Sequence, residues 1–157
     1  MKQAEAHIFQ INISDGGVPK RSQPTAEVTT FGLRGDWQRD TEHHGGRDRA
    51  LCLYSLDHIL WLQEEGHPIY PGSTGENLTI VGLDWSIVVP GTQFRLGDQV
   101  TIEITGYAAP CRTIQDSFAG QGYGRISAKT NPGWARAYAR VLVPGPIAIG
   151  DKVAPIE

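Results

Sequence analysis

The sequence predicts a mostly β fold, a β-barrel that carries one main helix and short peripheral helices. Short runs alternate apolar and polar residues with a period of two, they are rich in Val, Ile, Thr and aromatic residues, and glycine and proline separate them. A chain of 157 residues can bury one well-formed core. We therefore expect residues 1–157 to form a single domain.

Eight runs have the pattern of strands. In the first, HIFQINIS, the side chains of Phe9, Ile11 and Ile13 fall on one face, because successive residues of a strand point to opposite sides. A sheet of seven or eight strands follows from this run and the later ones, which in chain order are AEVTTF, RALCLY, ENLTIV, WSIVV, QVTIEIT, ARVLV and IAIGDKVAPI.

One segment has helical spacing. Ser55 is a suitable N-cap, Asp57 lies in the first turn, and Gly66 provides a stop. We expect this helix to pack on the barrel through Leu56, Ile59, Leu60 and Leu62. Shorter helical pieces are expected at 112–118 and 134–138, with a mobile loop around Gly120, Gly122 and Gly124 between them.

Composition and charge exclude several classes of partner. Lysine and arginine total 14 against 17 aspartates and glutamates, a net charge of −3, so the chain has no general attraction to nucleic acid or to an anionic membrane. No run of 18 apolar residues and no secretory leader is present. We expect a cytoplasmic protein whose two cysteines are reduced and unpaired.

Two common cofactor sites are not indicated. GQGYGR lacks the spacing of a dinucleotide-binding fingerprint, and the adjacent His43 and His44 have no partner at a zinc-site spacing. His44 with Gly45 and Gly46 is open to two interpretations. It forms a nest for an anion or a polar ring, or the histidine simply hydrogen-bonds within its own turn.

The two cysteines differ in their neighbours. Cys52 lies between leucines and has the pattern of a small buried hydrophobe. Cys111 follows Pro110 and precedes Arg112, whose positive charge would favour the thiolate form. From these residues alone, Cys111 is a reactive thiol or an inert one.

Taken in order, five segments resemble the MOSC domain family, which is found at the C-terminus of molybdenum cofactor sulfurases, in stand-alone bacterial proteins and in amidoxime-reducing molybdoenzymes. The resemblance runs from about Ile11 to the last strand. The segments that carry it are GLRGDWQRD, HHGGRDRALCLYS, GSTGENLTIVGLD, GTQFRLGDQVTIEIT and APCRTI.

The resemblance implies a β-barrel that binds the molybdenum cofactor, molybdopterin. It implies that Cys111 carries sulfur as a persulfide or ligates molybdenum, and that the loops around the pocket contain His44, Gly45, Gly46, Glu76 and Asn77. The terminal phosphate of the pterin would need cationic partners. We expect these among Lys20, Arg34, Arg47 and Arg112, and we expect His44, Glu76 and Cys111 to converge on one concave site.

This chain also departs from the family pattern. Thr74 stands where many relatives carry an aromatic residue, and neither the helical C-terminal region nor the N-terminal β-domain of longer members is present. A homodimer or a partner subunit would then complete the pocket.

Three classes of function stay open. The first is a molybdenum-cofactor protein that transfers sulfur or reduces N-hydroxylated compounds, with a sulfur donor or a redox protein as its partner. The second is a cofactor-independent thiol enzyme in which His44 is the base for Cys111 and Asp40 or Asp48 orients the imidazole. The third is a non-catalytic binding module.

Overall fold

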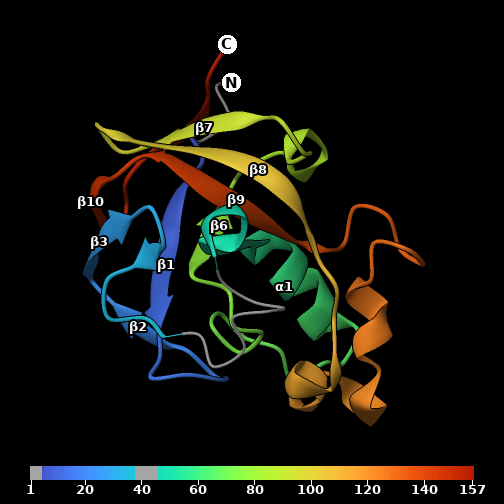
Figure 1. Ribbon diagram of the computed structural model, residues 1–157. Helices are drawn as coiled ribbons and strands as arrows, with labels where there is room; N and C mark the ends of the chain where they lie inside the picture. Colours follow the sequence, from blue (N-terminus) through green and yellow to red (C-terminus); the bar gives the residue numbers. More distant parts are fainter. Residues whose placement is uncertain (1–4, 38–45) are drawn as a thin grey trace.

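The computed structural model describes residues 5–37 and 46–157 and confirms a mostly β fold (Figure 1). One α-helix, α1 (Leu56–Glu64), and five short 3₁₀ helices accompany the strands. The 3₁₀ helices are η1 (Arg47–Arg49), η2 (Trp85–Ile87), η3 (Arg112–Ser117), η4 (Ala119–Gln121) and η5 (Tyr123–Ile126). The strands are β1 (His7–Ile13), β2 (Arg21–Gln23), β3 (Thr25–Thr29), β4 (Gly32–Leu33), β5 (Leu51–Ser55), β6 (Leu78–Val81), β7 (Gln93–Leu96), β8 (Val100–Ala108), β9 (Arg136–Val143), β10 (Gly145–Ala148) and β11 (Val153–Pro155).

The strands form a large and a small sheet. The large sheet has eight strands in the order β11-β7-β8-β9-β5-β6-β1-β2, and the small one has the order β10-β3-β4. Among these strands, β5 and β6 alone pair in parallel, because the connection between them carries α1 across the sheet. All the other pairs of the described strands are antiparallel.

The large sheet curls until its two ends approach each other, but it is not a closed barrel. The Ile8 amide donates to the Asp151 carbonyl, and the Val153 amide donates to the Ala6 carbonyl, each at 2.9 Å. These bonds join the start of β1 to the start of β11. The ladder nevertheless ends at β2 on one side and at β11 on the other, which corrects the expectation of a closed barrel.

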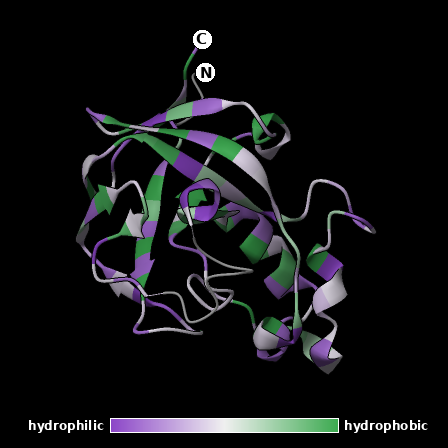
Figure 2. Cartoon of the chain, in the orientation of Figure 1, coloured by the Kyte–Doolittle hydropathy of each residue, from purple (hydrophilic) through white to green (hydrophobic). Residues whose placement is uncertain are grey.

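The core lies on the concave side of the large sheet. Alternating hydropathy is visible along β7 and β8 in Figure 2. In β8 the buried Val100, Ile102 and Ile104 alternate with the half-buried Thr101 and Glu103. The alternation buries one face of the strand, as the period of two predicts.

Helix α1 begins and ends where the sequence predicts. The Ser55 hydroxyl accepts the His58 amide at 3.2 Å as an N-cap, and Gly66 follows the helix with a φ of 99°. Leu56, Ile59 and Leu62 are buried, whereas Leu60 is 48% exposed. The expectation that Leu60 packs inward was therefore wrong, because Leu60 lies about 100° around the helix from Ile59, at the margin of the buried stripe. None of the described helices has the length and apolar character needed to cross a bilayer.

Two local predictions were wrong. The run WSIVV contains η2, because the Asp84 carboxylate accepts the Ser86 amide at 3.0 Å and stabilises a turn in place of a strand. Residues 134–138 are not helical, since β9 begins at Arg136 and pairs with Ala108. The glycine-rich segment between the two expected helical pieces contains η4 and η5.

Candidate functional site

Neighbouring strands bring polar side chains and a thiol together at one end of the large sheet. Tyr138 of β9 pairs with Cys52 of β5, and Arg136 lies two residues before Tyr138 and so on the same face. The Asn77 amide donates to the Cys52 carbonyl, and the Asn12 amide donates to the Asn77 carbonyl, both at 2.7 Å. The row therefore crosses β9, β5, the residue before β6, and β1.

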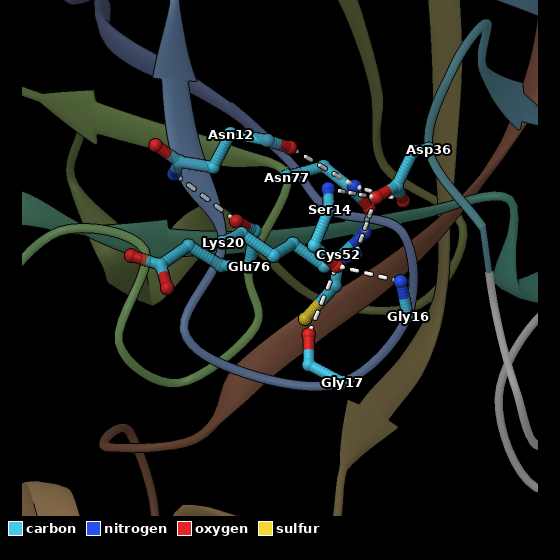
Figure 3. A network of polar contacts seen from close by, with 9 residues as sticks. All are labelled: Asn12, Ser14, Gly16, Gly17, Lys20, Asp36, Cys52, Glu76 and Asn77. Carbon is cyan, nitrogen blue, oxygen red and sulfur yellow. Dashed lines mark hydrogen bonds and ion pairs between the residues drawn. The ribbon is translucent and has the colours of Figure 1, made fainter.

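A buried ion pair joins this row to the N-terminal part of the chain (Figure 3). Lys20 Nζ lies 2.6 Å from Asp36 Oδ1, and the two side chains are only 4% and 5% exposed. The Ser14 amide donates to Asp36 Oδ1 at 2.9 Å, and Asn77 Nδ2 donates to Asp36 Oδ2 at 2.8 Å. Asn77 Oδ1 accepts the Cys52 amide at 3.0 Å. Asp36 thus connects Lys20 to the strand that contains Cys52.

Glu76 holds its own loop together. We call residues 72–77 the Glu76 loop. The carboxyl group of Glu76 accepts a hydrogen bond from the Gly72 amide at 3.1 Å and contacts the hydroxyls of Thr74 at 2.8 Å and Thr79 at 2.9 Å. Burial raises the pKa of Glu76. Gly72 has a φ of 90°, and a Cβ there would lie 2.5 Å from the Lys20 carbonyl oxygen, so glycine is required for this close approach.

Cys111 lies where β8 ends and the chain turns into η3. We call residues 109–117 the thiol segment. Cys111 has extended backbone angles, its carbonyl accepts the Ile114 amide at 3.1 Å, and the residue is half-buried. Cys111 is therefore more accessible to solvent than the buried Cys52.

Arg136 connects the thiol segment to the Glu76 loop. Its Nη1 donates to the Thr74 carbonyl at 2.7 Å, and its Nη2 lies 3.4 Å from the Ala109 carbonyl. Ser117 Oγ adds a second link, to the Ser73 carbonyl at 3.3 Å. The structure therefore links the Glu76 loop to the thiol segment, and the predicted concave site that Glu76 and Cys111 would share stays a prediction.

Cys52 is in a different environment from Cys111. It is 7% exposed and packs with Ala108 and Tyr138. Burial raises the pKa of Cys52 to about 11 and that of Tyr138 to about 12. The Arg49 guanidinium lies 5.2 Å from the centre of the Tyr138 ring, on the outer side of this small cluster.

The four cations predicted to bind phosphate differ in their availability. Arg34 and Arg112 are exposed, and so is Arg47, whose guanidinium lies 5.2 Å from the centre of the Phe31 ring. The Lys20 ammonium is buried in its pair with Asp36. None of the ion pairs between described residues involves one of these three arginines.

Part of the predicted site lies outside the described residues. Residues 38–45 lie outside the described residues, and they include His44, Gly45 and the Asp40 of the thiol-enzyme alternative. Gly46 is described, is exposed, and precedes η1. The convergence of His44 on the loops of Glu76 and Cys111 stays a prediction.

Sequence reasoning assigned no role to two residues that organise this region. Asp36 was one of many charged residues in a polar loop. Arg136 was assigned to a helical piece, although Arg136, Tyr138 and Arg140 recur every second residue through an otherwise apolar strand. That period of two was the available signal for a polar face on β9.

The metal ligand that this end of the sheet offers is a single thiol, that of Cys111. No group of three or more His, Cys, Asp or Glu side chains suited to a metal ion occurs within residues 5–37 and 46–157. A bare metal ion would find no cage there, whereas one accessible thiol can add a single soft ligand to a metal that arrives with ligands of its own.

Comparison with known proteins identifies the relatives of the chain. The model of the MOSC domain matches residues 40–154. The chain is 30% identical to the uncharacterized protein YflK of Bacillus subtilis, over 98% of the chain and 74% of YflK. It is 32% identical to the protein YiiM of Escherichia coli, over 83% of the chain and 57% of YiiM.

Two further matches extend this picture. A protein of Gibberella moniliformis named "Reductase" is 30% identical over 80% of the chain, which spans only 23% of that protein. The crystal structure of YiiM from Geobacillus stearothermophilus superposes with a TM-score of 0.75 at 24% identity, over 97% of the chain and 75% of that structure. At this level of identity the superposition supports the fold alone.

Proposed function

Because the chain belongs to the MOSC domain family, which is related to the C-terminal domain of molybdenum cofactor sulfurases, we propose that it binds the molybdenum cofactor at the Cys111 end of the large sheet. The observation that carries this proposal is the contrast between the two thiols. Cys111 is half-buried at the end of β8, whereas Cys52 is buried with a raised pKa. Cys111 is the thiol that a ligand can reach.

The thiol of Cys111 and three exposed arginines supply chemistry that suits such a group. A thiolate is a soft ligand for a transition metal, and the guanidinium groups of Arg34, Arg47 and Arg112 suit the phosphate of a pterin. Cys111 would hold the metal, and one or more of the arginines would hold the phosphate. Glu76 and Asn77 would support the site and not contact the cofactor directly, because their side chains are already engaged in the loop and in the Asp36 network.

The reaction that we propose is the reduction of N-hydroxylated compounds. When bound, the cofactor would supply two-electron redox chemistry between a separate redox protein and the substrate, with Cys111 as the residue that would hold its metal. Cleavage of the N–O bond consumes these electrons and two protons and releases water and the N–H product. The name of the fungal relative supports a reductase, and no part of the proposal depends on His44.

The test is cofactor content after expression in a host that makes the molybdenum cofactor. We expect molybdenum and pterin to purify with the wild-type chain and with Cys52→Ala in equal amounts, and molybdenum to be lost from Cys111→Ser. Metal analysis and the fluorescence of the oxidised pterin measure the two components. Equal molybdenum in all three proteins would refute Cys111 as the ligand, and absence of both components from wild type would refute cofactor binding.

The same preparation tests the transfer of sulfur. If Cys111 carries a persulfide, intact-protein mass spectrometry of wild type should show the addition of one sulfur atom, removable by a reductant and absent from Cys111→Ser. Persulfide without molybdenum would favour a sulfur carrier over the reductase that we propose.

A further inference from the structure

The thiol segment is attached to the Glu76 loop mainly through a side chain that belongs to neither. Arg136 lies at the start of β9, and its two terminal nitrogens contact the carbonyls of Thr74 and Ala109 at 2.7 and 3.4 Å. These carbonyls stand 62 and 27 residues away from Arg136 in the sequence. The guanidinium thus connects two loops that lie far apart along the chain.

The chemistry of the guanidinium suits this bridge. Its nitrogens are coplanar and point in fixed directions, so two carbonyls that bind it are held at a defined separation. A lysine ammonium is a point charge on a flexible stem and cannot impose that separation. Arg136 is itself only 5% exposed and belongs to a strand of the sheet, so the bridge rests on a rigid support.

The bridge is retained although it leaves a donor unsatisfied. Among the described residues, Arg136 Nε is buried and has no hydrogen-bond partner, as is also true of Arg140 Nε on the same strand. A buried N–H group without an acceptor destabilises a fold, and an apolar side chain would fill the same space without that cost. A role in packing alone does not account for an arginine at this position.

From this geometry we infer that Arg136 is the positioning residue for the Cys111 thiol: its buried guanidinium sets where the thiol segment stands against the Glu76 loop. The inference rests on the proposed function only in taking Cys111 as the functional thiol. The bridge itself is a property of the cofactor-free chain.

Arg140 provides a matched control. It lies on the same strand and the same side as Arg136, four residues on, but it is half-exposed and pairs with Asp48 at 3.2 Å and Glu103 at 3.6 Å. Its substitution removes an arginine from β9 without touching either loop.

The experiment is hydrogen–deuterium exchange on the cofactor-free protein, followed by mass spectrometry of peptides. In Arg136→Met, the amides of the thiol segment and of the Glu76 loop should both exchange about tenfold faster or more, because a hydrogen bond to a charged group is lost on each side. The β7–β8 hairpin should keep its wild-type rate. Arg136→Lys should show the same two-loop pattern with a smaller increase, and Arg140→Met should leave both loops unchanged.

A rescue experiment separates positioning from loss of general stability. Methylguanidinium added to Arg136→Ala should slow exchange in both loops again, because it can occupy the space of the missing group, whereas methylammonium should not. Should Arg136→Met fail to fold, Arg136→Lys decides the question.

The inference is overturned if exchange rises in one loop only, in the hairpin equally, or nowhere. Molybdenum analysis is a separate measurement. Wild-type protein without molybdenum would refute the proposed function, but it would not affect the inference about Arg136. A protein that binds the cofactor, with unchanged exchange in the Arg136 variants, would refute the inference about Arg136 and leave the proposed function standing.

Discussion

Cys52 lies inside the sheet, where burial raises the pKa of its thiol to about 11, whereas Cys111 is half-buried at the end of β8. At pH 8 the ionised fraction of Cys52 is then about one part in a thousand. We expect iodoacetamide to label Cys111 first in the folded protein and Cys52 only after unfolding. Peptide mapping by mass spectrometry after brief exposure measures both sites. Equally fast labelling of Cys52 in the folded state would contradict this expectation.

Glu76 predicts a pH dependence of stability. Its carboxyl pKa is higher in the folded protein than the value of about 4.3 in an unfolded chain, because burial disfavours the charged form. The contribution of the protonated carboxyl is therefore complete below about pH 4.3 and is lost as the pH rises through the folded pKa.

The variant Glu76→Gln tests this dependence. The amide is neutral at every pH and can donate to Thr74 while it accepts from Gly72 and Thr79. Relative to wild type, the free energy of unfolding of the variant should therefore increase from about pH 4 to about pH 8. Urea unfolding across this range measures it. A constant difference between the two proteins would show that Glu76 has the same pKa in both states.

Lys20 and Asp36 predict a large cost for breaking a buried ion pair. Lys20→Met leaves the Asp36 carboxylate buried beside the Ser14 amide and Asn77, and should lower the free energy of unfolding by about 3–5 kcal/mol. The control is Lys152→Met, which removes an exposed pair with Glu5 and should cost about 1 kcal/mol or less. Equal losses in the two variants would mean that the Lys20 pair is solvated.

The neighbouring residues in the sequence predicted the environment of some side chains but not of others. The leucines beside Cys52 and the proline before Cys111 are neighbours in the chain, so the different burial of the two thiols was visible. Arg136 takes its role from carbonyls 62 and 27 residues away, and Lys20 takes its partner from 16 residues away. No local pattern records contacts of this kind.

At the scale of elements, the N-cap of α1 is the clearest local determinant. Ser55→Ala removes the acceptor for the His58 amide and should destabilise the protein by about 1 kcal/mol. Ser86→Ala is the control, since the Ser86 amide keeps its bond to the Asp84 carboxylate and the cost should be much smaller. Thermal unfolding followed by circular dichroism compares the two. A loss no larger than that of the control would mean that tertiary packing alone fixes the start of the helix.

Elements were predictable where one local signal dominated. The cap, the apolar spacing and the final glycine all agreed on α1, and the alternation of β8 had no competing signal. The run at 85–89 has strand-like residues, yet the Asp84 side chain captures the backbone and produces η2. The strands β2 and β4, of three and two residues, are too short to show any period.

For the whole molecule we propose that residues 1–157 unfold as one unit. Most buried apolar residues of the described ranges form one large cluster, with contributions from both sheets and from α1, and Cys52, Ala108 and Tyr138 form a small second one. Far-UV circular dichroism and the fluorescence of the four tryptophans should then report a single coincident transition in urea. Separate midpoints for the two probes would indicate two independently stable parts.

The order of the strands could not be read from the sequence. Alternation marks which segments are strands, but the placement of β11 beside β7 and of β9 between β8 and β5 depends on long-range pairing. The same holds for the gap between β2 and β11, which separates a curled open sheet from a barrel.

The bonds between the start of β1 and the start of β11 also determine how the polypeptide can be rearranged. The Val153 amide donates to the Ala6 carbonyl and Lys152 pairs with Glu5 at 3.1 Å, so the first described residues lie beside β11, close to the C-terminal end of the chain. In Figure 1 the C-terminal end lies at the top and the short helices that follow Cys111 lie at the bottom. A few glycines would link the ends, so a circular permutant opened at the exposed turn around Asp98 should fold and keep the Cys111 end intact. For the same reason we expect that the domain can be inserted into a host protein as a cassette, with both junctions on one side and the short helices that follow Cys111 on the opposite side.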